Sequence, residues 1–508
     1  MPPIAERVLF LGLDGATMSV LGPLFDRGWL PNLASLWRRS ATGTLRSTMP
    51  MVTPVAWSSF ATGMTPKSHG ILDFQYLDPA DRTVRSNHAG RLNAPHLWEL
   101  LGRRGRSVVS LNLPMTWPCP PVRGIVVAGA DAPGRASAFA QCPDFGDELA
   151  AEVPAYTHKL LWKTRPRTLE ALKAEVDRTI DAFHAQAEAA IRAEGRVGWS
   201  ALMVHFHNLD GMQHRLWPYL DLDETAAHQP AWTAQVARAF RALDDAAGRL
   251  LELADRRGAA VIAASDHGFG PCKALVDVNG LLRKAGLQRG LAYGTRFRYR
   301  LNRIADRLRR HQSRLDGERP RTPRSLAGLV GCDWRRTAAF APYGQLCAHV
   351  YLNEHVAGVG VIDEVVGVLR SARDPSTGDA LFADAFAVAD RFGLDPAERG
   401  LPAVMAPSAD GYQAQAKWDR AHRSPLAADW DLPATHRMAG VLALDAPGVR
   451  AGASLDTELH DVAPTALAIL GLEAPAAMEG TAISEAFRPP SRINEWGRPA
   501  PSRSPLRV

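Results

Sequence analysis

Short runs of apolar residues recur along the chain and predict strands. They cover residues 7–13, 107–113, 124–130, 200–206, 259–265, 347–352 and 440–444. The first run suits a strand that is buried on both faces of a parallel sheet. Apolar residues at helical spacing predict helices between the runs, over 31–40, 97–104, 168–194, 232–257 and 461–471. Weak periodicity between about 132 and 165 predicts a segment rich in loops, and 393–430 follows no pattern that we can assign.

Acidic residues follow three of the predicted strands. Asp14 comes after the first, Asp210 after the fourth and Asp266 after the fifth. Taken singly, such an Asp is explained by a turn or a helix cap. Three carboxylates at the carboxyl ends of strands suggest one polyanionic crevice, where α/β sheets bind ligands and where bound cations relieve repulsion.

Histidines accompany two of these acids. His214 lies four residues after Asp210, so one helical turn would place both on the same face. His267 directly follows Asp266. A further histidine, His436, precedes the last predicted strand, where a surface position is the alternative. Mixed Asp and His side chains are ligands of divalent metals.

One hydroxyl stands out in the stretch 49–74. Thr53 is followed by a proline and by a segment of small residues, and later by the pair His69-Gly70. A threonine hydroxyl is a poor nucleophile until a base or a metal removes its proton. The alternative is that Thr53 caps the helix that follows. Asp461 is likewise expected to cap a helix.

Composition places the chain among ordinary globular proteins. Of 508 residues, 46% are hydrophobic and 22% are charged. No apolar run approaches the roughly 20 residues that cross a bilayer. The five cysteines show no CxxC spacing, which argues against a disulfide framework or a thiolate zinc site. Because the first residues also lack a signal-peptide pattern, we expect a cytoplasmic protein.

Positive charge is concentrated in one segment. Residues 291–324 contain eleven Arg and three acidic residues, whereas the whole chain carries a net charge of only +6. The segment is expected to form a basic amphipathic helix on the surface. It is either a solvated insertion or a contact for an acidic substrate, nucleic acid or a lipid surface.

Six blocks of residues, taken in order, resemble the alkaline phosphatase superfamily in its type I phosphodiesterase/nucleotide pyrophosphatase branch. The blocks are Leu13-Asp14-Gly15, Thr53 with Thr62-Gly63, Pro66 and His69-Gly70, Asp210 with His214, Ser265-Asp266-His267-Gly268, Thr435-His436, and Asp461 to Thr465. The resemblance implies an α/β three-layer sandwich with a largely parallel central sheet and inserted cap segments. The catalytic domain is expected over 1–487, with insertions at about 132–200 and 285–335. A Pro/Arg-rich tail is expected over 488–508.

The resemblance also implies the site. Asp14, Thr53, Asp266 and His267 would hold one divalent metal, and Asp210, His214 and His436 a second. Zinc suits these ligands, with manganese as the alternative. Thr53 would attack phosphorus and form a covalent phosphothreonine, so that the chain hydrolyses phosphate esters.

Two departures from the pattern limit the substrate. Sulfatases carry Cys or Ser before x-Pro-x-Arg, but here Thr53 is followed by Pro54-Val55-Ala56, which argues against a sulfatase. Phe74 occupies the position at which nucleotide pyrophosphatases carry a phosphate-binding Asn. Together with Val55, Trp57 and Phe60, it predicts apolar surroundings that favour phosphodiesters over monoesters.

Three alternatives remain open. The same site could serve a phosphotransferase or phosphomutase, because only the acceptor pocket decides what receives the group from Thr53. It could also serve a phosphomonoesterase. A catalytically silent binding protein is disfavoured, because the nucleophile and all the other ligand positions are filled.

Overall fold

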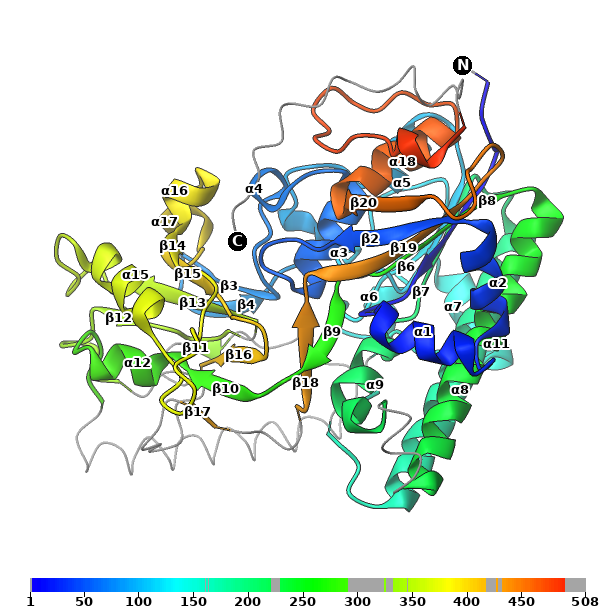
Figure 1. The fold of residues 1–508 in the computed structure, drawn as a ribbon. Helices are drawn as coiled ribbons and strands as arrows, with labels where there is room; N and C mark the ends of the chain where they lie inside the picture. Colours follow the sequence, from blue (N-terminus) through cyan, green and yellow to red (C-terminus); the bar gives the residue numbers. More distant parts are fainter. Residues whose placement is uncertain are drawn as a thin grey trace. The chain divides into compact units, whose positions relative to one another are not determined.

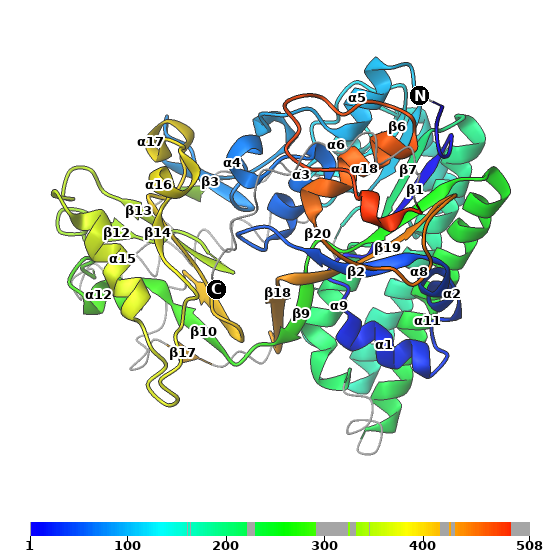
Figure 2. The same ribbon diagram turned by 45° about the horizontal axis from the view of Figure 1, so that its top comes forward.

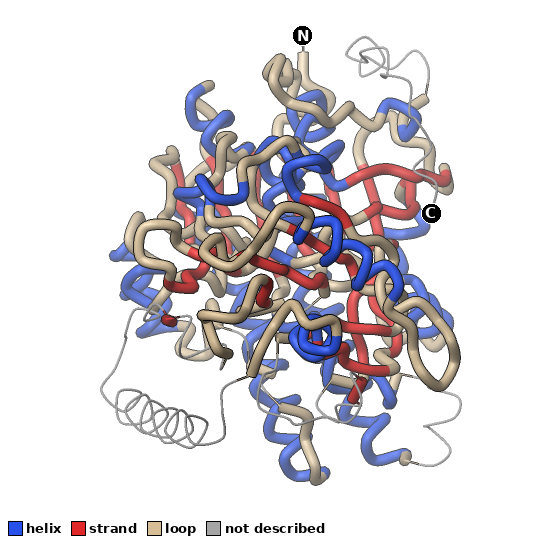
Figure 3. The backbone as a smooth tube through the Cα atoms, turned by 90° about the vertical axis from the view of Figure 1, so that its left-hand side faces the viewer, coloured by secondary structure: helices blue, strands red, loops and turns tan. Residues whose placement is uncertain are grey.

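The computed structural model describes residues 2–488 except 160, 163, 221–228, 291–323, 326–331, 345, 417–425 and 428–431, and the remainder is drawn in grey in Figure 3. The described residues form two compact units. The main unit contains those within 1–71, 88–270 and 431–507, and the second unit contains those within 72–87 and 271–430. The Arg-rich segment 291–324 lies almost wholly outside the described residues, as does the expected tail after 488.

An eight-stranded sheet forms the centre of the main unit (Figure 1). Its order is β20 (Ser454–Glu458), β2 (Ala41–Arg46), β19 (Ala439–Asp445), β8 (Ala260–Ala264), β1 (Val8–Gly12), β7 (Ala201–His205), β5 (Val108–Leu111) and β6 (Gly124–Val127). Only β19 runs against its neighbours β2 and β8 in this sheet. The predicted α/β fold with a largely parallel sheet is therefore confirmed.

Different helices cover the two faces of this sheet (Figures 1 and 2). One layer contains α1 (Met18–Asp26), α2 (Pro31–Arg39), α8 (Leu169–Arg196) and α11 (Pro230–Arg257); the other contains α3 (Thr53–Thr62), α5 (Leu97–Arg103) and α18 (Val462–Ile469). Along β1, Leu9 and Leu11 pack in the first layer's core, whereas Val8 and Phe10 pack in the second. Side chains of a strand alternate between faces, so a strand covered on both sides must be apolar throughout. This explains why such strands appear in the sequence as uninterrupted apolar runs.

The segment between 132 and 165, which is expected to be rich in loops, contains two short helices. They are α6 (Arg135–Ala138) and α7 (Pro143–Glu152). On α7, Phe145 and Leu149 are buried four residues apart, which is one turn. Two apolar anchors in ten residues are too few to give a clear period in the sequence.

The remaining elements of the main unit are short. They are α4 (Pro66–His69), η1 (Ala89–Arg91), α9 (Asn208–Leu216), η2 (Trp217–Tyr219), β9 (Gly268–Pro271), β18 (Ala434–Arg437), η3 (Leu459–Asp461) and η4 (Ser484–Ala486). Asp461 directly precedes α18, but its carboxylate makes no cap there. It accepts instead from the backbone N–H groups of Glu458 and Thr481, at 3.1 and 2.8 Å. The residue therefore ties the end of β20 to the loop at Thr481.

The second unit is built from small sheets around its own core. One sheet contains β12 (Ala339–Phe340), β13 (Cys347–Leu352), β15 (Val404–Pro407) and β14 (Phe386–Ala387). Two others contain β16 (Tyr412–Gln415), β10 (Ala274–Asp277) and β17 (Leu426–Ala427), and β11 (Arg324–Ser325), β4 (Thr83–Ser86) and β3 (Gln75–Leu77). Its helices are α12 (Val278–Lys284), α15 (Val361–Ser371), α16 (Val388–Phe392) and α17 (Pro396–Arg399). Among the described residues of both units, no helix has the length and apolar character that a membrane span requires.

Candidate metal centre

The sheet brings the acidic strand ends together in the main unit. Gly12 at the end of β1 lies level with His205 of β7 on one side and with Ala264 of β8 on the other. Asp14 and Asp266 each follow two residues later. Asp210 lies in the first turn of α9, directly after β7. The chain therefore delivers three carboxylates to one edge of the sheet.

One group of ligand atoms consists of Asp210, His214 and His436. The Nε2 atoms of the two histidines are 3.0 Å apart. Asp210 Oδ1 lies 3.5 Å from His214 Nε2 and 3.3 Å from His436 Nε2. Ligand atoms bonded at about 2.0–2.1 Å in a tetrahedron lie about 3.3 Å from one another. The three atoms therefore have the spacing of one face of a tetrahedral metal site.

A second group consists of Asp14, Asp266 and His267. His267 Nε2 lies 3.3 Å from Asp266 Oδ2 and 3.7 Å from Asp14 Oδ1. The same nitrogen is 3.9 Å from Asp210 Oδ1, so the two groups adjoin. All of these side chains are buried or nearly so, the most exposed being Asp210 and His214 at 16%.

The three histidines are held in one tautomer. His214 Nδ1 donates to the carbonyl of Ala434 at 2.9 Å, and His436 Nδ1 donates to that of Met51 at 2.8 Å. His267 Nδ1 donates to the carbonyl of Gly268 at 3.1 Å. A carbonyl only accepts, so each Nδ1 carries the proton and each Nε2 presents a lone pair. Carbonyl partners of this kind orient metal-ligating histidines.

The electrostatics of the cluster suit a bound cation. Burial, with the nearby charge of Asp210, raises the pKa of Asp14 well above its ordinary value, and burial next to Asp14 does the same to the pKa of Asp266. Burial also lowers the pKa of His214 to about 4. Within the described chain, Asp14 Oδ1, Asp210 Oδ1, Asp266 Oδ2 and His267 Nε2 are buried without a hydrogen-bond partner. Converging lone pairs without donors fit divalent metal ions.

Phe269 fixes the histidine rings from one side. Its ring centroid lies 4.7 Å from that of His214, 5.2 Å from that of His436 and 5.7 Å from that of His267. The ring also lies against Gly15, where a Cβ would come within 2.5 Å of it and where φ is +70°. Only glycine fits this position. The glycine of the Asp14-Gly15 pair therefore makes room for the aromatic ring behind the ligands.

Thr53 is the first helical residue of α3, so it does not cap the helix; Val52 occupies that place. The side chain of Thr53 is half-buried. Two residues earlier, the carbonyl of Met51 accepts the proton of His436. The segment that leads into α3 is thus tied directly to a candidate ligand.

The His69-Gly70 pair stabilises α3 through a hydrogen bond between His69 and Ser59 of that helix. His69 is fully buried, and burial lowers the pKa of its imidazole to about 3. Its Nδ1 accepts from the backbone N–H of Ile71 at 3.2 Å, so the proton is on Nε2 and donates to Ser59 Oγ at 3.0 Å. The pair therefore braces the helix rather than acting as a base.

Replacing Ser59 by alanine is expected to destabilise the protein by about 1–3 kcal/mol, because the buried N–H of His69 loses its acceptor. Metal content should stay unchanged, since Ser59 contacts none of the candidate ligands in the described contacts. Denaturant unfolding followed by circular dichroism measures the change. A midpoint identical to that of the parent would contradict the bracing role.

Two residues at the cluster were not singled out from the sequence. Phe269 is one, and the other is His205, the last residue of β7, whose Nε2 lies 3.0 Å from Asp14 Oδ2. A histidine inside an otherwise apolar strand run is visible in the sequence. Its contact with Asp14 depends on the pairing of β1 with β7, which the sequence does not state.

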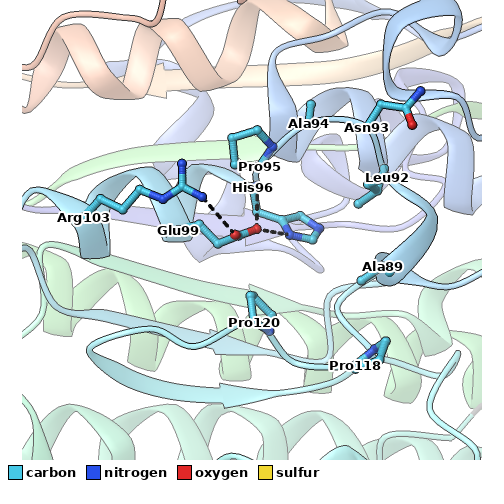
Figure 4. Close-up of a pocket in the computed structure, with 11 residues that line it drawn as sticks. Ala89, Leu92, Asn93, Ala94, Pro95, His96, Glu99, Arg103, Pro118 and Pro120 are labelled. Atoms are coloured by element: carbon cyan, nitrogen blue, oxygen red, sulfur yellow. Dashed lines mark hydrogen bonds and ion pairs between the residues drawn. The ribbon is translucent and has the colours of Figure 1, made fainter.

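A cavity of about 400 Å³ lies elsewhere in the main unit (Figure 4). It is lined by a proline-rich loop and by α5, where Glu99 contacts His96 and Arg103. His96 Nε2 donates to the carbonyl of Met115 at 2.9 Å. None of the candidate ligands lines this cavity. His96 and Glu99 contact each other at the start of α5, so these two side chains stabilise the first turn of that helix.

Comparison with known proteins gives one family and one fold. The family model described as type I phosphodiesterase/nucleotide pyrophosphatase matches residues 8–326. Phosphonoacetate hydrolase from Sinorhizobium meliloti 1021, solved with phosphonoformate, is similar in structure, with a TM-score of 0.56 and 16% identity over 92% of this chain and 96% of that one. Human ectonucleotide pyrophosphatase/phosphodiesterase 5 gives 0.52 and 13% over the same shares. No curated protein sequence matches the chain.

Proposed function

Because the chain belongs to the type I phosphodiesterase/nucleotide pyrophosphatase family, within the alkaline phosphatase superfamily, we propose that it is a two-metal hydrolase of phosphate esters with Thr53 as nucleophile. The observation that carries the proposal is the pair of adjoining ligand groups, in which four buried oxygen and nitrogen atoms have no hydrogen-bond partner among the described residues. Asp14, Asp266, His267 and Thr53 would hold one ion. Asp210, His214 and His436 would hold the other.

Two divalent ions, zinc or manganese, would lower the pKa of the Thr53 hydroxyl and neutralise charge on the phosphoryl oxygens. The protein's own part is to place the hydroxyl at the amino end of α3. The positive end of the helix dipole there favours both an alkoxide and a bound phosphate group.

The reaction proposed has two steps. Thr53 Oγ1 forms a bond to phosphorus, while the bond from phosphorus to the leaving oxygen breaks and that oxygen takes up a proton. Water then attacks the phosphorus of the phosphothreonine. This step restores the Thr53 hydroxyl and releases the phosphoryl product. A transferase would differ only in the acceptor of the second step.

We expect phosphodiesters to be preferred over monoesters. The description of the matching family as a phosphodiesterase supports this preference. The measurement is the ratio of kcat/KM for bis(4-nitrophenyl) phosphate to that for 4-nitrophenyl phosphate, with zinc or manganese at saturation.

A ratio above one supports the diester assignment, and a ratio clearly below one would replace it with a monoesterase. Phosphonoacetate belongs in the same panel, because a hydrolase of that compound shares the fold. Hydrolysis of none of the three compounds by fully loaded protein would count against the proposed function itself.

A further inference from the structure

Gln213 lies in α9 between the two candidate ligands that this helix carries. It comes three residues after Asp210 and directly before His214, so one helical turn places it on the face of Asp210. Its side chain is almost completely buried, with 1% exposed. A buried amide is normally hydrogen-bonded. The bond that Gln213 makes therefore indicates its role.

The amide of Gln213 holds the turn that follows β1. Its Nε2 donates to the carbonyl of Gly15 at 2.9 Å, and this bond is buried. A Cβ on Gly15 would lie 2.5 Å from the ring of Phe269 and 3.2 Å from Gln213 Nε2. The glycine is thus enclosed by the aromatic ring and by the amide. Gln213 therefore connects the helix that carries Asp210 to the turn that carries Asp14.

The backbone of Gly15 also holds Asp266. The N–H of Gly15 donates to Asp266 Oδ1 at 3.1 Å in a second buried bond. Asp266 Oδ2 has no hydrogen-bond partner among the described residues and lies 3.3 Å from His267 Nε2. The turn itself is closed by a bond from the N–H of Ala16 to the carbonyl of Leu13 at 3.0 Å. A displacement of Gly15 would therefore also move the carboxylate of Asp266.

We propose that Gln213 is a positioning residue of the metal centre, which fixes the carboxylates of Asp14 and Asp266 relative to α9 through the backbone of Gly15. This inference rests on the proposed function. The described hydrogen bonds join Gln213 to none of the candidate ligand side chains, so it acts through the turn. Partners that orient metal ligands raise metal affinity by about 10–100-fold.

Gln213→Met removes the amide donor and keeps a side chain of similar length. The matched control is Gln288→Met in the second unit. Gln288 is also 1% exposed, and its Nε2 donates to Asn279 Oδ1 at 2.8 Å. Zinc affinity is measured by competition with a chromophoric chelator. The visible spectrum of the Co²⁺-substituted protein reports the ligand geometry, which a loss of stability elsewhere would not change.

We expect Gln213→Met to bind zinc about 10–100-fold more weakly and to show a changed Co²⁺ spectrum, whereas Gln288→Met matches the parent in both. Affinity and spectrum equal to those of the parent in Gln213→Met would overturn the inference. Equal losses in the two variants would also overturn it, because the loss of any buried amide would then be the cause. A parent protein that binds no zinc would instead overturn the proposed function.

The His436→Ala background assigns the loss to one ligand group. On that background the group of Asp14, Asp266 and His267 is expected to stay complete. Gln213→Met should weaken zinc binding there as well, and an unchanged affinity would overturn the inference.

Gln213→Asn is a second variant, which shortens the side chain by one methylene and withdraws the amide from Gly15. We expect it to weaken zinc binding in the otherwise unchanged chain by about threefold or more. If Gln213→Met does not fold, the decision falls to Gln213→Asn, and an affinity identical to that of the parent would overturn the inference.

Discussion

Thr53→Ala is expected to lower kcat by about three orders of magnitude or more, because it removes the proposed nucleophile, the atom that would form the covalent intermediate. The fold should persist. Thr53 is half-buried at the first position of α3 and caps nothing, so its loss should change stability by less than about 1 kcal/mol. Steady-state hydrolysis of bis(4-nitrophenyl) phosphate at saturating metal measures the effect.

Two variants on the same helix control this result. Thr53→Ser keeps a hydroxyl and should retain measurable activity. Thr62→Ala removes a hydroxyl at the other end of α3, where it donates to the carbonyl of Ser58 at 2.7 Å. It should cost stability without a comparable fall in kcat. If Thr53→Ala hydrolyses the diester at the parent rate, water attacks phosphorus directly and the covalent route is wrong.

The sheet could be predicted from the sequence because of how it is covered. β1, β7 and β8 are buried on both faces, and this leaves uninterrupted apolar runs. Each predicted run lies within about three residues of the observed strand at either end. By contrast, α7 buries few side chains and gave no recognisable period.

The candidate ligands could be listed, but their partners could not. Asp14, Asp210 and Asp266 are visible because each follows an apolar run in the chain. The carbonyls that fix the histidine tautomers belong to Ala434, Met51 and Gly268, and backbone atoms leave no mark in a sequence. His205 meets Asp14 only through strand pairing.

The sequence argument for an apolar substrate pocket was wrong in part. Val55, Trp57 and Phe60 are fully or almost fully buried in the main unit, and Phe60 and Trp57 pack against each other and against the sheet in its core. They cannot surround a substrate. Phe74 is 39% exposed and belongs to the second unit. The proposed preference for diesters therefore rests on the family.

His436→Ala is expected to leave about one divalent ion per chain where the parent carries about two. The second group would retain only Asp210 and His214, and the tie from His436 to the carbonyl of Met51 would be lost as well. Because that tie leads into α3, the start of the helix that carries the proposed nucleophile should also be less well fixed. Hydrolysis should fall by more than about 100-fold.

His184→Ala is the matched control, since His184 is an exposed residue of α8 and the same side chain is lost. Ion content is measured by elemental analysis after gel filtration into metal-free buffer. The control and the parent should both keep about two ions, and a chelator should abolish hydrolysis in both. Retention of two ions by His436→Ala would remove this histidine from the ligand set. Full activity of metal-stripped parent would refute metal dependence altogether.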